Sequence, residues 1–490
     1  MTKKLISSLL TLSLLWAVTS CTAQKQTHQN TVKVLTTTGD RLHDLSTYTT
    51  TLQKNNKNNN TPDITLMPNE KYQTIYGFGA AITGATCYNL MQMAPADRKA
   101  FLTTTFSETE GFGQNYVRVS IGCSDFSLSE YTLCDTQGIQ NFALTNEEKN
   151  YLIPILQEIL AINPKVQIIG SPWTAPRWMK VNNLTDLQPY NEWTSGQLNP
   201  AYYHDYALYF AKWLQAMKDN QINVGAITIQ NEPLNRQNSA SMYMGWDEQL
   251  AFIKNELGKT LRDKGFPNVK IYLFDHNYNY DNIESQKQYP IHIYKDPQAS
   301  QYVAGTAFHN YGGTTSELSN IHSQYPNKEL IFTESSIGKW NDGRNLKRRL
   351  TEDMEELGIK TLNNHCKAVI VWNLLLDEHG APNRDKGCKT CFGAVDIQTS
   401  NYKTMQRNSH YYVISHLAAV IKQGATRIGI QNNTNKQILS TAFQNPDNTL
   451  ALIVVNKNQQ PTPLTVKHTN TYFTYQLPPN SVVSFLIPQN

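Results

Sequence analysis

Short apolar runs rich in β-branched and aromatic residues recur along most of this chain. Each run has the composition of a strand, and polar segments or turn residues bound it. The pattern predicts eight strands in this part of the chain. They are Ile75–Ile82, Tyr116–Ile121, Val166–Ser171, Val224–Gln230, Val269–Phe274, Val303–Phe308, Leu330–Thr333 and Ala368–Trp372.

Helix-length segments separate the predicted strands. The clearest are Glu147–Ile162, Ala201–Asn220, Met242–Lys264 and Asn345–Asn364. Strand and helix alternating eight times predict an α/β fold, a (β/α)8 TIM barrel over residues 71–408. A doubly wound open sheet is the alternative, but no glycine-rich phosphate loop follows the first strand.

Beyond residue 408 the pattern changes to closely spaced strands with polar turns. They are Ile438–Phe443, Leu450–Val455, Pro463–Lys467, Thr471–Gln476 and Ser481–Ile487. Because no crossover helices separate them, we expect a C-terminal β-sandwich over residues 409–490. An isolated strand at Val32–Thr37 has no partner in the barrel, so residues 32–70, which include an Asn-rich loop, are expected to join this sandwich.

The first 21 residues have the layout of an export signal. Two lysines precede an apolar run over residues 5–18, which is too short to span a membrane by itself. Small residues before Cys21 resemble a bacterial lipoprotein signal, so we expect lipid attachment at Cys21 and a tether over residues 22–31. This lipid would be the only link to a membrane, and it places the protein in the bacterial cell envelope, in the periplasm or on the surface. Secretion with cleavage nearby is the alternative.

The composition is polar but strongly aromatic. Hydrophobic residues make up 40 % and charged residues 17 %, and the chain holds 26 Tyr, 16 Phe and 8 Trp. Such an aromatic content suits sugar binding. The formal charge of +4 comes from scattered lysines and arginines rather than a basic stripe, so nucleic acid is not an expected partner.

Besides Cys21 the chain holds an even set of cysteines, which permits disulfides in an exported protein. The closest pairs in the sequence are Cys123 with Cys134 and Cys388 with Cys391. The C-x-x-C spacing of the second pair also occurs in zinc sites, but two further ligands at a suitable spacing are missing. We therefore expect no metal and no organic cofactor.

Two of the predicted strands end on a glutamate. The run Ile227–Asn231 is followed by Glu232 and Pro233, and a proline cannot donate to a sheet ladder, so the strand stops and leaves Glu232 at its rim. The run Leu330–Thr333 ends on Glu334. Two carboxylates at strand ends suggest an acid and a nucleophile that act as a pair. The alternative is a pair of surface glutamates.

Other predicted strand ends bring polar and aromatic side chains to the same end of the barrel, where chemistry is expected in this fold. They are Asp125, Trp173, Asn231, His309, Tyr311 and Trp372. Arg118, inside the second strand, is suited to hold and ionise Glu334 through a charge-assisted hydrogen bond. Most of these residues also have a structural alternative: core packing for the tryptophans, a satisfied histidine for His309, helix capping for Asp125 and Asn231, and a simple ion pair with a carboxylate for Arg118.

Several motifs occur in a fixed order along the chain. They are Gly77–Thr83, Arg118–Ser120 with Asp125–Ser127, Ser171–Trp173 with Trp178–Lys180, Asn231–Pro233, Thr333–Glu334, and Trp372–Asn373 with Gly380–Asn383. Together they resemble glycoside hydrolase family 30, and within it the branch of glucosylceramidases and endo-β-1,6-glucanases. Asn-Glu-Pro alone is common to many barrel glycosidases, but the ordered set is specific.

The resemblance implies a (β/α)8 barrel with a side β-sandwich, and a catalytic pair at strands four and seven. By position, Glu232 matches the acid/base and Glu334 the nucleophile. Residues around the sugar in the first subsite are matched by Asp125, Trp173, Asn231, His309, Tyr311 and Trp372. Departures from the family pattern at Ala80, Gly84 and Ala381 lie around the mouth, so they concern the leaving group more than the chemistry.

We therefore expect a retaining β-glycoside hydrolase that cleaves β-glucosidic bonds through a covalent glycosyl-enzyme. Its substrate would be a β-linked glycan or glycolipid, either glucosylceramide-like or a β-1,6-glucan. One alternative is a retaining hydrolase of another β-glycan, such as xylan or galactan. A carbohydrate-binding barrel without turnover is the other, and the presence of both glutamates argues against it.

Overall fold

The structure of this protein is a computed structural model that describes residues 30–54 and 61–488. Cys21 and the predicted tether up to residue 29 lie outside the described residues. The chain divides into two compact units. One runs from Gln73 to Ala425, and the other combines residues that precede Gln73 with residues that follow Ala425. Segments from both ends of the chain therefore build the second unit.

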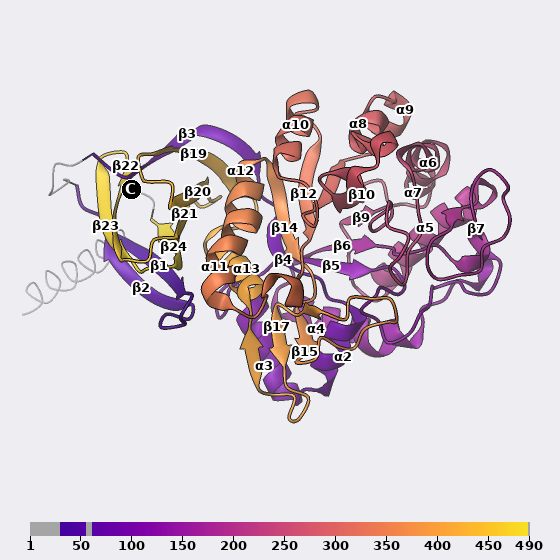
Figure 1. The fold of residues 1–490 in the computed structure, drawn as a ribbon, viewed down its shortest axis with the longest axis horizontal. Helices are drawn as coiled ribbons and strands as arrows, with labels where there is room; N and C mark the ends of the chain where they lie inside the picture. The colour runs from indigo at the N-terminus through magenta and orange to yellow at the C-terminus, as the bar shows by residue number, and fades with distance from the viewer. Residues whose placement is uncertain (1–29, 55–60, 489–490) are drawn as a thin grey trace, which may run out of the picture. The chain divides into compact units, whose positions relative to one another are not determined.

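Within the described residues, eight parallel strands form the centre of the first unit (Figure 1). They are β4 (Gly77–Ala80), β5 (Tyr116–Ser120), β6 (Gln167–Ser171), β9 (Ala226–Thr228), β10 (Lys270–Asn277), β11 (Gly305–His309), β12 (Glu329–Glu334) and β14 (Cys366–Val371). Hydrogen bonds link them in the order β4-β14-β12-β11-β10-β9-β6-β5. Each predicted strand overlaps one of them.

The two ends of this series meet and close the barrel. Ala81, just after β4, forms a parallel bridge with Arg118 of β5, and the Ile82 N–H donates to the Arg118 carbonyl at 2.8 Å. The predicted (β/α)8 barrel is confirmed, and an open doubly wound sheet is excluded.

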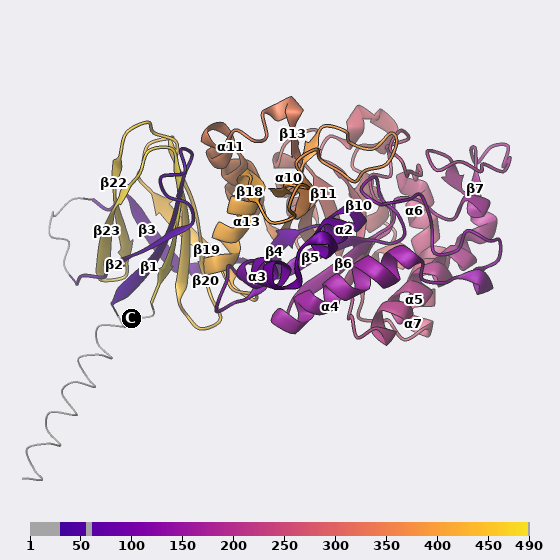
Figure 2. The same ribbon diagram turned by 90° about the horizontal axis from the view of Figure 1, so that it is seen from below.

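Helix α5 (Tyr203–Asp219) shows how the outer layer packs on the strands. It buries Tyr206, Phe210 and Trp213, which lie at the i, i+4, i+7 spacing of one helical face. The Trp213 ring takes the place of a side chain at Gly170 in β6, where an added Cβ would lie 2.3 Å from the ring. Figure 2 shows α4 and α5 on the outside of β5 and β6.

In the described ranges, three predicted helices contain a π-helical stretch. These are Glu148–Leu152 leading into α4 (Ile153–Ile162), Ile253–Leu257 between α6 (Trp246–Phe252) and α7 (Gly258–Asp263), and Met354–Lys360 between α11 (Leu346–Asp353) and α12 (Thr361–Asn363). Further helices are α2 (Gly84–Gln92), α3 (Pro95–Phe106), α8 (Tyr289–Tyr294), α9 (Pro297–Ser300), α10 (Ser316–Gln324) and α13 (Ser409–Val420).

Helix α13 falls in the barrel unit, which ends at Ala425, whereas the sequence pattern placed the boundary at residue 408. The sequence of this helix, SHYYVISHLAAV, is buried along most of its length. A helix without a polar face shows no amphipathic period, so the pattern gave no signal for it.

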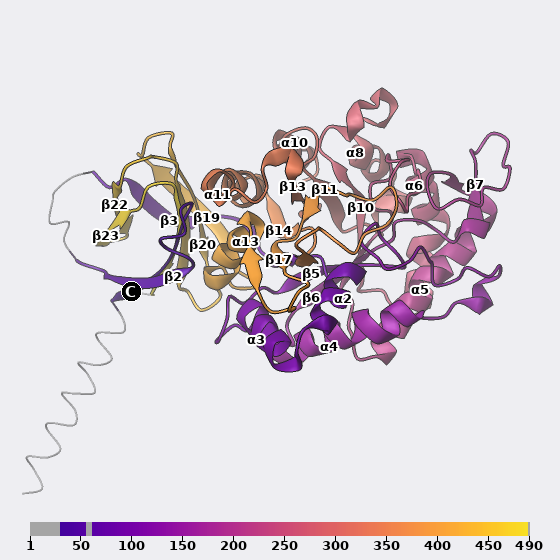
Figure 3. The same ribbon diagram turned by 60° about the horizontal axis from the view of Figure 1, so that its bottom comes forward.

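The second unit contains one nine-stranded sheet within the described ranges, in the order β2-β1-β24-β21-β20-β19-β3-β22-β23. Strand β1 (Thr31–Thr38) pairs antiparallel with β24 (Ser481–Ile487). The sheet edges approach each other where Gln53 and Tyr472 exchange two hydrogen bonds of 2.8 Å. The predicted β-sandwich with an added N-terminal strand is confirmed (Figure 3).

Alternating side chains fill the interior of this sheet. Val32 and Val34 of β1 are buried in one cluster with Leu452, Val454 and Phe485, while Lys33 between the valines is exposed. The other predicted strands are present as β20 (Ile438–Gln444), β21 (Leu450–Asn456), β22 (Thr462–His468) and β23 (Thr471–Leu477).

Three strands of this sheet were not predicted. They are β2 (Ser46–Thr51), β3 (Ile64–Thr74) and β19 (Thr426–Asn432). Strand β2 reads STYTTT and has no fully buried position, so it lacks the apolar alternation by which a strand is recognised.

Cys388 and Cys391 form a disulfide, whereas Cys87, Cys123, Cys134 and Cys366 are buried thiols. The sulfurs of the C-x-x-C pair are therefore bonded to each other, and the zinc alternative for this pair is wrong. Among the described residues, we find no helix that is both long and apolar enough to cross a membrane.

Candidate active site at the carboxyl end of the barrel

A pocket of about 320 Å³ opens where the barrel strands end. Segments that follow β5, β6, β9, β10, β11, β12 and β14 line it, as expected for a site at the carboxyl face of this fold. Seven of the residues predicted from the sequence line this pocket, and they are Asp125, Trp173, Asn231, Glu232, Tyr311, Glu334 and Trp372.

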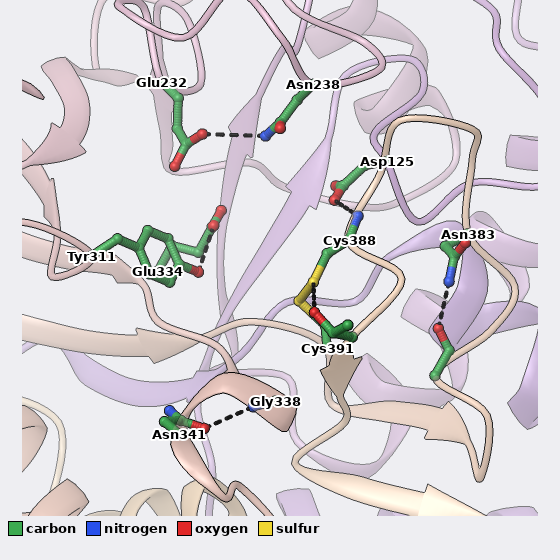
Figure 4. Close-up of a disulfide and its surroundings, with 12 residues drawn as sticks. Asp125, Glu232, Asn238, Tyr311, Glu334, Gly338, Asn341, Asn383, Cys388 and Cys391 are labelled. Atoms are coloured by element: carbon green, nitrogen blue, oxygen red, sulfur yellow. Dashed lines mark hydrogen bonds between the residues drawn. A yellow bond between two sulfur atoms is a disulfide. The ribbon is translucent and has the colours of Figure 1, made fainter.

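Glu232 and Glu334 lie together in this pocket (Figure 4). One carboxylate oxygen of each lies within 4.8 Å of the other. Glu232 has a φ of 43°, which non-glycine residues rarely adopt, and its N–H donates to the Asp275 carbonyl at 3.0 Å. Such strain persists where the surroundings enforce it, as at functional sites. The short separation fits a retaining pair, about 5–5.5 Å apart, better than an inverting pair, about 6.5–9.5 Å apart.

Glu334 is held by two donors. Arg118 Nη1 donates to Oε2 at 2.6 Å, and the Tyr311 hydroxyl donates to Oε1 at 3.0 Å. Burial raises the pKa of Glu334, and the charges of His309 and Arg118 lower it without offsetting the burial. Arg118 thus makes the predicted contact, but burial outweighs its ionising effect.

Glu232 has a different environment. Its Oε2 accepts from the side-chain amides of Asn235 at 2.8 Å and Asn238 at 3.3 Å, and its Oε1 lies 3.3 Å from His309 Nδ1. Burial opposes ionisation, but His276 and His309 lower the pKa of Glu232 to about 2. The two histidines therefore favour the ionised form of this carboxyl group.

Asp275, which the sequence analysis missed, links the other polar groups below the pocket. Its fully buried carboxylate accepts from Arg118 Nη2, Ser171 Oγ and Thr228 Oγ1, each at 2.7 Å, and from Thr333 Oγ1 at 2.6 Å. Burial disfavours its charge, but Arg118 and His309 hold its pKa well below the usual range. Asp275 directly follows the fifth predicted strand, so a systematic reading of all strand ends would have found it.

His309 lies behind the carboxylates rather than in the wall of the pocket. It is fully buried and is not among the lining residues. Its Nε2 lies 3.1 Å from Asp275 Oδ1, and its Nδ1 faces Glu232. Burial lowers its basicity, but Glu334, Asp275 and Glu232 raise the pKa of His309 to about 9. His309 is thus a charge partner of the carboxylates, and the sugar contact implied for it stays a prediction.

Two aromatic rings and an amide line the inner part of the pocket. Trp173 and Trp372 stack with ring centroids 5.1 Å apart, and the Arg118 guanidinium lies 4.9 Å and 5.5 Å from the two ring centres. Asn231 Oδ1 accepts from Arg118 Nη2 at 2.7 Å, which leaves its amide nitrogen for a ligand. The two tryptophans therefore pack in the core and also form part of the pocket wall.

Asp125 is nearly buried at a different part of the pocket wall. Its Oδ2 lies 3.5 Å from the Cys388 N–H, and burial together with the charge of Glu334 raises the pKa of Asp125 to about 8. A carboxyl group in this state both donates and accepts hydrogen bonds, which suits sugar hydroxyls.

Several lining residues were missed, most of them because they lie in loops rather than at strand ends. They include His276, Asn277, Asp281, Ser336, Trp340, Cys388 and Cys391. His276 and Asn277 carried a signal, since they follow Asp275 at the end of β10. The loop residues carried none, because local sequence does not tell where a loop points.

Glu232, His309 and Glu334 are close enough to share a metal ion, since one ligand atom of each lies within 4.8 Å of the others. We assign no metal to them. Arg118 already occupies one oxygen of Glu334, and a protonated His309 supplies the positive charge between the carboxylates.

Both units match known protein domains. The glycosyl hydrolase family 30 TIM-barrel domain matches residues 75–421, and the glycosyl hydrolase family 30 beta sandwich domain matches residues 424–485.

Individual relatives agree with these matches. The chain is 26 % identical to the lysosomal acid glucosylceramidase of Mus musculus, over 85 % of this chain and 81 % of that protein. It is 31 % identical to an endo-1,6-beta-D-glucanase of Neurospora crassa, over 73 % of this chain and 72 % of that protein. Among solved structures, the endo-beta1,6-glucanase BT3312 is 56 % identical with a TM-score of 0.91, and the match covers 94 % of this chain and 99 % of that one.

Proposed function

Because this chain belongs to glycosyl hydrolase family 30, we propose that it is a retaining endo-β-1,6-glucanase. Membership makes it an O-glycosyl hydrolase with a glycan substrate. The linkage is carried by one observation, the 56 % identity to an endo-β1,6-glucanase over 94 % of the chain, against 26 % to a glucosylceramidase.

The proposed chemistry uses the two glutamates in unlike roles. Glu334 attacks the anomeric carbon and forms a covalent glycosyl-enzyme, while Glu232 donates a proton to the departing glycosidic oxygen. Glu232 then takes a proton from the water that hydrolyses the intermediate, so the anomeric configuration is retained. Arg118 and Tyr311 orient the attacking carboxylate. Trp173, Trp372, Asn231 and Asp125 enclose the sugar.

The proton for the first step is stored on His309 in the free enzyme. Contact between the two groups raises the pKa of His309 and lowers that of Glu232, which places the shared proton on the imidazole. Asp275 holds the Nε2 side, so Nδ1 is the atom that releases a proton to Glu232 Oε1, 3.3 Å away. A neutral sugar that excludes water disfavours the separated charges and drives this transfer.

The product profile tests the linkage. Purified enzyme is incubated with a linear β-1,6-glucan, glucosylceramide, xylan and a β-galactan, and the products are separated by chromatography. We expect β-1,6-linked glucose oligosaccharides of several lengths from the first substrate and no release from the xylan or galactan. Glucose from glucosylceramide alone would overturn the proposed linkage in favour of the glycolipid.

We also propose that Cys21 carries a lipid that anchors the enzyme in the bacterial cell envelope. The support is the sequence alone: an apolar run and small residues precede this cysteine. An enzyme held outside the cytoplasm meets polymeric glucans before transport, which agrees with endo action.

A further inference from the structure

Trp340 stands out among the aromatic residues of the pocket. Its side chain is 53 % exposed, and no other tryptophan in the described residues is classed as exposed. It belongs to the short turn Lys339–Asn341, which follows the strand that ends in Glu334, and it lines the same pocket as both glutamates. A large exposed aromatic ring with a polar N–H at a binding pocket is suited to cover the face of a sugar.

The backbone around Trp340 is tied to a second loop. Gly338 pairs with Cys391 in a two-stranded ladder between β13 (Ile337–Gly338) and β16 (Cys391–Phe392), and the Lys339 N–H donates to the Thr390 carbonyl at 2.9 Å. The Trp340 ring lies against Gly338, where an added Cβ would come within 2.0 Å of it. The ring position therefore depends on a glycine and on the partner loop.

The partner loop is closed by the Cys388–Cys391 disulfide, and both of these residues line the pocket (Figure 4). The same loop covers Asp125. The Arg384 N–H donates to the Asp125 carbonyl at 2.7 Å, and an added Cβ at Gly387 would lie 2.9 Å from the Asp125 Cβ. One loop thus shuts the pocket at Asp125 and supports the turn that carries Trp340.

This arrangement separates a closed and an open part of the pocket. Asp125, Trp173 and Trp372 are nearly buried and enclose the sugar whose anomeric carbon is attacked. Tyr311, 43 % exposed, and Trp340 form the open rim. A substrate whose first sugar fills the enclosed part must extend past this rim. Every substrate carries a leaving group on the bond to be cleaved, so the leaving group is the part that we expect at the rim.

We propose that Trp340 is the stacking platform for the glucose on the leaving-group side of the cleaved bond, and that the loop closed by Cys388 and Cys391 holds this platform in place. The proposal rests on the proposed β-1,6-glucanase function. It assigns to Trp340 and to the disulfide a part in substrate recognition but none in the chemistry.

The test compares substrates that fill different parts of the pocket. A β-1,6-linked glucose oligosaccharide places glucose on both sides of the bond. β-Glucosyl fluoride places a single atom on the leaving-group side, and β-1,6-diglucosyl fluoride extends only the other side. Trp340→Ala should lower kcat/KM for the oligosaccharide by about tenfold or more, the scale of one lost aromatic contact, mainly through KM. Both fluorides should show a much smaller loss.

Two further variants make the comparison sharper. Trp340→Phe should recover part of the loss, because a ring remains. Tyr48→Ala removes an exposed aromatic ring in the sandwich unit, outside the pocket, and serves as the matched control with no selective loss.

The supporting loop is tested by Cys388→Ser combined with Cys391→Ser. This variant should lose more activity on the oligosaccharide than on either fluoride, although the fluorides should also lose some activity because the same loop covers Asp125. Adding Trp340→Ala to it should cause little further loss on the oligosaccharide, since both changes act on one contact.

Each contrary result is distinct. Equal losses on the oligosaccharide and both fluorides would overturn the platform, and a loss on diglucosyl fluoride but not glucosyl fluoride would place the ring on the other side of the bond. Additive losses would overturn the role of the disulfide loop. A wild-type enzyme that hydrolyses glucosyl fluoride but not the oligosaccharide would overturn the proposed linkage, and with it the glucose assigned to Trp340.

Discussion

Arg118 and Asp275 form a buried ion pair with Nη2 and Oδ2 2.7 Å apart, and both catalytic candidates depend on it. Arg118 extends from the pair to Glu334, and Asp275 extends from it through His309 to Glu232. Breaking a buried pair leaves an uncompensated charge, which costs about 3–5 kcal/mol. The pair therefore fixes the positions of both carboxylates relative to each other.

The roles of Glu232 and Glu334 can be separated by leaving group. Glu334→Gln should abolish turnover of every substrate, because no glycosyl-enzyme forms without the attacking carboxylate. Glu232→Ala should lose the natural glucan but keep the first step for a dinitrophenyl β-glucoside, whose leaving group needs no proton. The intermediate should then accumulate, since its hydrolysis lacks general-base help worth about 10²–10⁴-fold.

Burst kinetics and azide rescue measure this difference. Glu232→Ala should show a burst of dinitrophenolate followed by a slow steady state, and added azide should speed that state and yield a β-glycosyl azide. If Glu232→Ala loses all substrates equally and azide has no effect, Glu232 is not the acid/base. Proton NMR of the wild-type reaction should show the β-anomer first, and early α-anomer would mean inversion.

The pH dependence follows from the shared proton. In the wild type, kcat/KM for the glucan should fall on the acid side as Glu334 becomes protonated, and this fall should begin above pH 4.5 because the pKa of Glu334 is raised from that value. On the basic side kcat/KM should fall near pH 9, where His309 loses its proton. His309→Gln removes a cation that lowers the pKa of Glu334, so the acid limb of the profile should shift to higher pH. The basic limb should shift to lower pH, because Glu232 must then hold the proton itself.

A pH–rate profile of both enzymes measures the two limbs. His204→Gln is the control, because His204 is exposed, pairs with Glu256 and does not touch the carboxylates. A basic limb that stays near pH 9 in His309→Gln would show that the proton is stored elsewhere.

Among the elements of the barrel, the strands and the loops have different roles in the site. Strands β5, β10, β11 and β12 and the segment after β9 carry the groups of the charged network, so the register of the barrel sets their spacing. The loops that follow β11, β12 and β14 carry the rim and the disulfide. Changes in the loops should therefore alter which substrate is accepted, whereas changes at the strand ends should alter the rate of bond cleavage.

Strand β1 gives an element-level prediction for the sandwich. Val34 is buried in the core cluster, and Lys33 beside it on the same strand is exposed. Val34→Asp buries an unpaired carboxylate and should lower the free energy of unfolding of this unit by about 3 kcal/mol or more. Lys33→Asp should change it by only about 0.5 kcal/mol, as is usual for an exposed site.

Urea unfolding followed by circular dichroism, which reports the strands of the sandwich unit, measures both variants. Equal stabilities would mean that β1 does not contribute to the folded sandwich. Because β1 pairs with β24, the result also reports whether the N-terminal and C-terminal segments unfold together.

At the scale of the whole molecule, one chain combines a catalytic barrel, a sandwich built from both chain ends, and a predicted lipid attachment site. Cys21→Ala should move the enzyme from the membrane fraction to the soluble fraction of cells, because the lipid is the only anchor proposed. Thr22→Ala, which keeps the cysteine, is the matched control. Fractionation followed by an activity assay measures the distribution, and an unchanged distribution of Cys21→Ala would refute lipid anchoring.

The barrel, the sandwich and the places of both glutamates at strand ends could be predicted from the order of the amino acids alone. Strand periodicity, proline at a strand end and the order of motifs are local properties, and they are readable without knowing which segments meet. Glu232 and Glu334 were found because each directly ends an apolar run. The pairing of β1 with the C-terminal strands was expected for the same reason, since an apolar strand needs a partner.

How these groups act on one another depends on contacts between segments that are distant in the sequence. Asp275 gains its role from partners on β5, β6, β11 and β12, which lie far from it in the sequence. The lowered pKa of Glu232 depends on two histidines whose effect outweighs its burial, and the position of Trp340 depends on a ladder to the disulfide loop. Charges, hydrogen bonds and loop contacts act through space over a few ångströms, and closure of the barrel is what brings segments so distant along the chain within that range.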